Sequence, residues 1–286
     1  MIAHVAEAAE ARGRVVLQLR TANPSQVAIE AAVRVAQAFQ SGIETLFVED
    51  ANLFDLASFS FAREISLNGR RSRSISSDDI EQEFRLAFAS LQRRIEAMAR
   101  AAEVPINQRV VRDDPTAALA MTCAECGPWN VVALAEPFGI TSSESLGRLF
   151  EAVLDATGLV LVGPKARRTA GPVIAAVEDI DRLPSMLRAG ERLASVTGSP
   201  LVILPIADDA ERLRWMEAQM RLMLGDRTDT QIIAARAQGA AEVVAEALRR
   251  LRGGFVISQF GGLVVPADGD LRALAAALEC PLLLVR

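Results

Sequence analysis

The sequence alternates short apolar runs with longer segments of helical period, and the whole series occurs twice. The apolar runs lie at 14–20, 43–50, 106–112, 129–135 and 159–163, and again at 171–179, 200–206, 228–235, 253–260 and 280–286. Strands that alternate with longer helices are joined by right-handed crossovers into a parallel sheet, which helices cover on both faces. This alternation therefore predicts an α/β fold with a doubly wound parallel sheet in each half of the chain.

The helical segments place their apolar residues at intervals of three or four positions. They lie at about 24–40, 78–102, 182–197, 208–224, 239–250 and 269–278, with two more beginning at Pro115 and Ser142. The clearest amphipathic stripe, over 78–102, consists of Ile80, Phe84, Phe88, Leu91, Ile95 and Met98. On the helix over 208–224, one face is expected to carry Leu213, Met216, Met220 and Met223.

Length and composition suit two repeats of this kind. A chain of 286 residues with 51% apolar residues can fill two cores, and we expect repeats over 1–163 and 164–286. The net charge of −5 disfavours a nucleic-acid partner. No apolar run approaches the roughly 18 residues that span a bilayer, so no membrane partner is expected. Three cysteines and an N-terminus without a signal-peptide core favour a reduced, cytoplasmic setting.

Several stretches resemble the universal stress protein family. LRALAAALECPLLLVR (271–286) is similar to the closing helix and last strand of that family. AAVEDIDRLPSMLRAGERLA (175–194) resembles its first strand and helix, with Glu178 and Asp179 near the family's Asp-Gly-Ser turn. The segment 46–65 resembles a variable stretch that follows the second strand in bacterial members. The resemblance covers both halves, so the chain looks like a tandem member.

The resemblance implies a strand order of 3-2-1-4-5 in each half and association through the last strands. The strands at 159–163 and 281–285 would then pair antiparallel and make an intramolecular pseudo-dimer, with a homo-oligomer as a further possibility. Many members of the family bind ATP or AMP, and others have lost that ability. Any ligand would lie at the carboxyl ends of the strands, where the connection order reverses.

In the second half, the candidate nucleotide loop is FGGLVVPADGD (260–270), with Phe260, Gly261, Gly262 and Gly269. Glycines let a backbone approach a polyphosphate, and a helix N-terminus offers it free N–H groups. The stretch between the glycines is shorter than the family's loop, and aspartates flank Gly269. We expect a degenerate turn with reduced or lost nucleotide binding. The alternative is a genuine ATP or AMP site that uses these glycines and Asp179.

Two aspartates follow the first strand of this half, Asp179 and Asp181. Either could contact an adenine or a ribose. Asp181 serves equally well as the N-cap of the next helix, and capping is the favoured interpretation.

In the first half, the corresponding loop EPFGITSSES (136–145) contains Gly139 and a hydroxyl cluster made by Thr141, Ser142 and Ser143. Thr141 and Glu144 fit a capping box, which accounts for these residues without a ligand. The alternative is a site for one small anion, which Asn23 at the end of the first strand could face.

Catalytic motifs are absent from the sequence, and the chain is not expected to be an enzyme beyond very slow ATP hydrolysis. Cys123 and Cys126 form a Cys-x-x-Cys pair, but no second pair exists and the single histidine is His4. Buried, unreactive thiols are therefore expected, and no metal site.

The segment 53–67 is rich in phenylalanine and lies in a long connection. It folds back on its own domain, lies over the ligand crevice or presents a surface to a protein partner. The favoured function is a stress-associated binding or signalling protein without turnover, with an interaction scaffold through 53–67 as an alternative.

Overall fold

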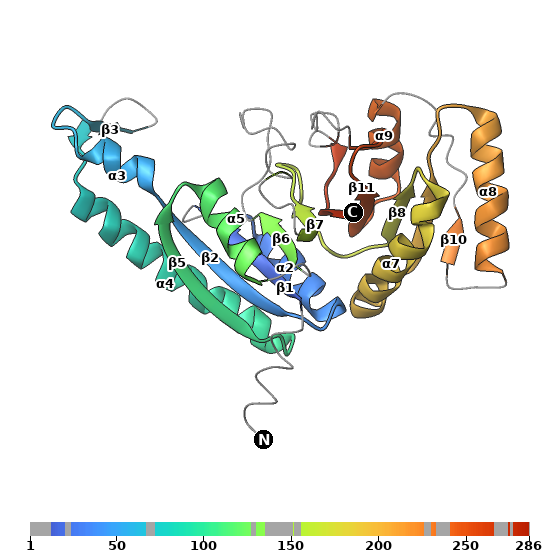
Figure 1. The fold of residues 1–286 in the computed structure, drawn as a ribbon, viewed down its shortest axis with the longest axis horizontal. Coiled ribbons are helices and arrows are strands. Elements are labelled where there is room, and N and C mark those ends of the chain that lie inside the picture. Colours follow the sequence, from blue (N-terminus) through green and yellow to red (C-terminus); the bar gives the residue numbers. More distant parts are fainter. Residues whose placement is uncertain are drawn as a thin grey trace, which may run out of the picture.

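The computed structural model describes residues 13–20, 24–66, 72–126, 130–134, 151, 156–225, 230–232, 241–265, 274 and 277–285 (Figure 1). The elements of the first half are β1 (Arg14–Leu19), α2 (Gln26–Ala38), β2 (Gly42–Asp50), α3 (Ala51–Ala57), β3 (Arg63–Ile65), β4 (Ser72–Ser74), α4 (Ser77–Ala101), β5 (Ile106–Asp113), α5 (Pro115–Cys126), β6 (Asn130–Leu134) and β7 (Ala156–Leu161). Those of the second half are β8 (Val173–Val177), η1 (Ile180–Arg182), α7 (Leu183–Thr197), β9 (Leu201–Pro205), α8 (Ala210–Leu224), β10 (Thr230–Ile232), α9 (Ala241–Arg250), β11 (Phe255–Gln259) and β12 (Leu282–Val285).

One ten-stranded sheet runs through the described part of the chain, in the order β10-β9-β8-β11-β12-β7-β6-β1-β2-β5. Each half contributes five neighbouring strands in the order 3-2-1-4-5, and the pairs within a half are parallel. The predicted fold class of two doubly wound repeats is confirmed.

The two halves meet at β7 and β12, which pair antiparallel, with Leu282 opposite Leu161 and Val285 opposite Gly158. These are the last strands that sequence analysis placed at 159–163 and 281–285, although β7 begins earlier, at Ala156. The repeat boundary at 163/164 falls between β7 and β8 and remains a prediction.

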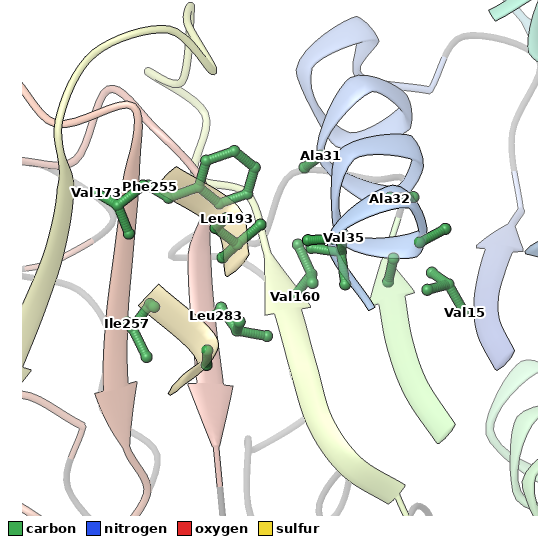
Figure 2. Close-up of a cluster of buried hydrophobic side chains, with 14 of the residues drawn as sticks. Val15, Ala31, Ala32, Val35, Val160, Val173, Leu193, Phe255, Ile257 and Leu283 are labelled. Atoms are coloured by element: carbon green, nitrogen blue, oxygen red, sulfur yellow. The ribbon is translucent and has the colours of Figure 1, made fainter. Parts of the chain in front are cut away.

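Helices lie on both faces of the sheet, and the core on one face continues across the junction of the halves. Figure 2 shows buried side chains from both halves in this cluster: Val15, Ala31, Ala32, Val35, Val160, Val173, Leu193, Phe255, Ile257 and Leu283. Two hydrogen bonds join the connection between the halves to α2. The Thr169 hydroxyl donates to Glu30, and the Arg34 guanidinium donates to the Thr169 carbonyl (both 3.1 Å). The halves therefore share a hydrophobic core as well as a sheet.

Local sequence signals account for the helix starts. The Asp209 carboxylate accepts from the N–H groups of Glu211 and Arg212 at the start of α8, and Asp114 caps α5 in the same way. Ser76 caps α4, whose first turn carries Asp78 and Asp79.

The predicted face of α8 is wrong at one position. Met223 is half exposed, and the buried stripe is Leu213, Met216, Met220 and Leu224. Steps of both three and four residues continue a helical stripe beyond Met220, so the spacing alone did not distinguish Met223 from Leu224.

Candidate functional site

The candidate site lies at the carboxyl ends of β8 and β11, which are parallel neighbours in the second half. Glu178 and Asp179 follow β8 directly, and the segment 260–265 follows β11. In the sheet, β8 has β9, the next strand along the chain, on one side and β11 on the other. The order in which strands are connected therefore reverses between β8 and β11. In open α/β sheets this is the place where ligands bind.

The loop after β11 folds back on itself. The N–H groups of Gly261 and Gly262 both donate to the carbonyl of Val265, at 2.8 and 3.1 Å. Gly261 has a φ of 86°, a left-handed conformation that glycine adopts without the strain of a side chain. The first glycine is therefore explained by the turn itself.

The next two N–H groups of the loop, those of Leu263 and Val264, donate to the carboxylate of Glu178. Leu263 N–H is bound to Oε2 and Val264 N–H lies 3.1 Å from Oε1. Glu178 is buried, with 8% of its surface exposed. Four successive N–H groups, from Gly261 to Val264, thus have acceptors within the chain.

Gly262 is explained by the same carboxylate. A Cβ built at this position would collide with both oxygens of Glu178. A glycine here lets the Glu178 side chain reach the loop backbone, which is the kind of close approach that a ligand phosphate also requires.

The carboxyl group of Glu178 lies in an environment that disfavours its charged form. Burial raises the pKa of its carboxyl group above the usual value, and the nearby charge of Asp208 raises it further. The two backbone N–H donors act in the opposite direction and offset part of this increase. The carboxyl groups of Glu178 and Asp208 therefore both lie at the site before any ligand arrives.

Asp179 and Asp181 act locally. The Asp179 carboxylate accepts from the N–H of Asp181 at 3.0 Å and caps the short helix η1. The expectation that Asp181 is the N-cap is wrong, because the helical turn begins at Ile180 and Asp181 lies within its first turn. Phe260 is half-buried against the core on the face that α5 and α9 cover.

Six predicted site residues lie outside the described residues: Gly269, Asn23, Gly139, Thr141, Ser142 and Ser143. Glu178 is the residue that sequence analysis did not choose for the site. Its position in the sequence could have indicated a role in the site. Glu178 directly follows a completely buried five-residue strand, at the edge of the sheet where ligands bind.

Among the cysteine side chains that the structure describes, those of Cys123 and Cys280 are buried. The side chain of Cys126 lies outside the described part of the chain. Burial raises the pKa of the Cys280 thiol to about 12, so it stays protonated at neutral pH.

Within the described residues, no cluster of three or more His, Cys, Asp and Glu side chains is suited to a metal ion. No described helix is long and apolar enough to cross a membrane.

The segment after β2 folds into α3 and a small β3–β4 hairpin, not into a plain connection. Figure 1 shows α3 and β3 at the end of the molecule far from the second half. Phe54 anchors the segment, since its ring packs on Phe84 and the Arg112 guanidinium lies 3.9 Å from its centroid. Large apolar side chains remain exposed around it: Leu53, Leu56, Phe59, Phe61 and Ile65.

Comparison with solved structures identifies the architecture. A candidate universal stress protein from Pseudomonas aeruginosa UCBPP-PA14 superposes with a TM-score of 0.58 at 15% identity, covering 97% of this chain and 94% of that chain. The fold is that of the universal stress proteins. A universal stress protein from Archaeoglobus fulgidus DSM 4304 matches with a TM-score of 0.54 at 14% identity, over 95% of this chain and 96% of that one.

The cytoplasmic domain of a prokaryotic cation chloride cotransporter also matches, with a TM-score of 0.56, 9% identity, and coverage of 96% of this chain and 95% of that chain. Because each match covers nearly the whole length, the likeness to the universal stress protein fold extends over both halves. No family model and no curated protein matches the sequence.

Proposed function

We propose that this chain is a binding or signalling protein of the stress-response type, without catalytic turnover and with reduced or lost nucleotide binding at its second-half loop. One observation carries the proposal: the carboxylate of Glu178 is the acceptor for the N–H groups of Leu263 and Val264. Phosphate loops bind their ligands through free backbone N–H groups. A nucleotide would have to displace Glu178 and approach the charge of Asp208 as well.

A thermal-unfolding scan with and without millimolar ATP, AMP and magnesium tests this proposal. We expect no shift of the unfolding temperature, with magnesium chloride of equal ionic strength as the control. A ligand at about 100 times its Kd would stabilise the protein by about 2.7 kcal/mol. That stabilisation corresponds to a rise on the order of 5–10 °C. Such a rise, lost on Gly262→Val, would instead establish the alternative, a genuine ATP or AMP binder.

A second candidate function is an interaction scaffold through the segment 53–67. The exposed rings of Phe59 and Phe61 favour it, since they stack on each other with centroids 5.3 Å apart and are 51% and 75% exposed. Clusters of exposed apolar side chains mark protein-binding surfaces.

If 53–67 is the contact surface, Phe59→Ser combined with Phe61→Ser should abolish self-association, measured by light scattering, while the unfolding temperature stays within a few degrees. Phe54 is left intact because it anchors the segment to α4. The matched control is Leu222→Ser on α8, which removes an equally exposed apolar side chain from a distant helix. Association that survives in the double variant counts against the scaffold.

A further inference from the structure

We propose that the loop 261–264 is an oxyanion-binding site that the chain keeps occupied with the carboxylate of Glu178, and that removing this carboxylate lets a phosphate group bind in its place. The inference rests on the proposed function, because it explains why the loop has no room for an external anion. Glu178 then acts as an autoinhibitory side chain, which any phosphate-bearing ligand must displace.

The hydrogen-bonding pattern is that of an anion site. The successive N–H groups of Leu263 and Val264 each bind a different oxygen of one carboxylate. Backbone N–H groups that bind an ionised oxyanion make stronger hydrogen bonds than those between neutral groups. A phosphate group offers the same pair of charged oxygens, so the two donors suit either anion.

The space at the site also fits an exchange of anions. Glu178 oxygens lie where a Cβ of residue 262 would be, so a glycine at 262 and a short residue at 178 together leave an open slot beside the backbone. Ser258 points to the same face of the sheet as Glu178, by the alternation along β8 and β11. Its hydroxyl is completely buried and has no hydrogen-bond partner within the described residues.

The attachment of Glu178 to β8 gives it an advantage over free ligands. A group that is part of the chain competes at an effective concentration in the millimolar range without losing translational freedom. This advantage holds the carboxylate in the loop although burial and Asp208 both disfavour its charge. An external anion of similar intrinsic affinity is excluded until the side chain is shortened.

The test compares inorganic phosphate binding to the whole protein and its variants, measured by titration calorimetry at constant ionic strength with chloride as the balancing anion. Glu178→Ala is expected to bind phosphate at least 10-fold more tightly than the unchanged protein. In the Glu178→Ala background, adding Gly262→Ala places a methyl group in the opened slot and should return the affinity to the starting value. Asp208→Ala removes a neighbouring like charge without opening the loop, so its gain in phosphate affinity should be much smaller than that of Glu178→Ala.

The outcomes separate this inference from the proposed function. No gain in Glu178→Ala, or an equal gain in Asp208→Ala, overturns the inference and leaves the proposed function standing. Phosphate binding by the unchanged protein that is as tight as in Glu178→Ala overturns both. If Glu178→Ala does not fold, Glu178→Ser replaces it. If neither folds, hydrogen exchange at neutral pH decides, since fast exchange of the Leu263 and Val264 amides contradicts a bound carboxylate and slow exchange supports it.

Discussion

Replacing Phe255 with alanine is expected to lower the free energy of unfolding by about 3–5 kcal/mol. Phe255 lies on β11, opposite Val173 of β8, and its side chain is completely buried in the core cluster of Figure 2. Truncation removes the transfer free energy of the ring and leaves a cavity that the surrounding strands fill incompletely. Because this core crosses the junction, the loss is expected in the unfolding of both halves, measured by urea denaturation.

The matched control for this prediction is Phe61→Ala. The same ring is deleted, but Phe61 is 75% exposed and lies in the excursion after α3. Surface substitutions of this kind usually change stability by no more than about 0.5 kcal/mol. Similar losses for Phe255→Ala and Phe61→Ala would contradict the packing of β11 between β8 and β12.

The order of strands and helices was predictable from the apolar pattern of each element. Strands that are buried on both faces are runs of apolar residues, and helices that are buried on one face carry an amphipathic stripe. β9 is Leu201–Pro205, a run of buried residues inside the segment expected at 200–206. The amphipathic stripe over 78–102 became α4, Ser77–Ala101, whose start is fixed by the Ser76 cap. In both cases the pattern follows from the period of the element and needs no knowledge of its neighbours.

Elements outside the ten-stranded sheet were harder to predict. α3 and the β3–β4 hairpin have little buried surface of their own, so no periodic pattern marks them between Ala51 and Ser74. Such segments depend on what lies beside them, which sequence spacing does not specify.

At the site, the sequence predicted the glycines and missed their partner. Gly261 and Gly262 mark a close approach of backbone to something, but a ligand phosphate and a chain carboxylate impose the same requirement. The carboxylate comes from Glu178, 85 residues before Leu263, so no local pattern connects the two. The expectation of a degenerate loop rested on loop length and the aspartates beside Gly269. The proposed function rests on a separate physical reason, the carboxylate of Glu178 that accepts from the loop N–H groups.

Gly158→Ala is expected to weaken the pairing of β7 with β12 and to cost about 1–3 kcal/mol of the free energy of unfolding. A Cβ at this position would lie 2.9 Å from the carbonyl oxygen of Leu284, a backbone atom that cannot rotate away. Gly158 lies opposite Val285 at the end of the pair that joins the two halves of the sheet. Relief of the contact requires β7 and β12 to separate locally.

Two measurements check this expectation, the midpoint of urea unfolding and the hydrogen exchange of amides along the β7–β12 pair, which should become faster in Gly158→Ala. Gly42→Ala is the matched control, because the nearest atom to a Cβ at Gly42, at the start of β2, lies at an ordinary contact distance of 3.4 Å. If both variants behave alike, the strands are not packed as closely as the structure places them. If Gly158→Ala alone loosens the pair, the alignment of the two repeats depends on the absence of a side chain at this position. Gly158 lies in the part of β7 that precedes the apolar run expected at 159–163, so the spacing of apolar residues could not have indicated its importance.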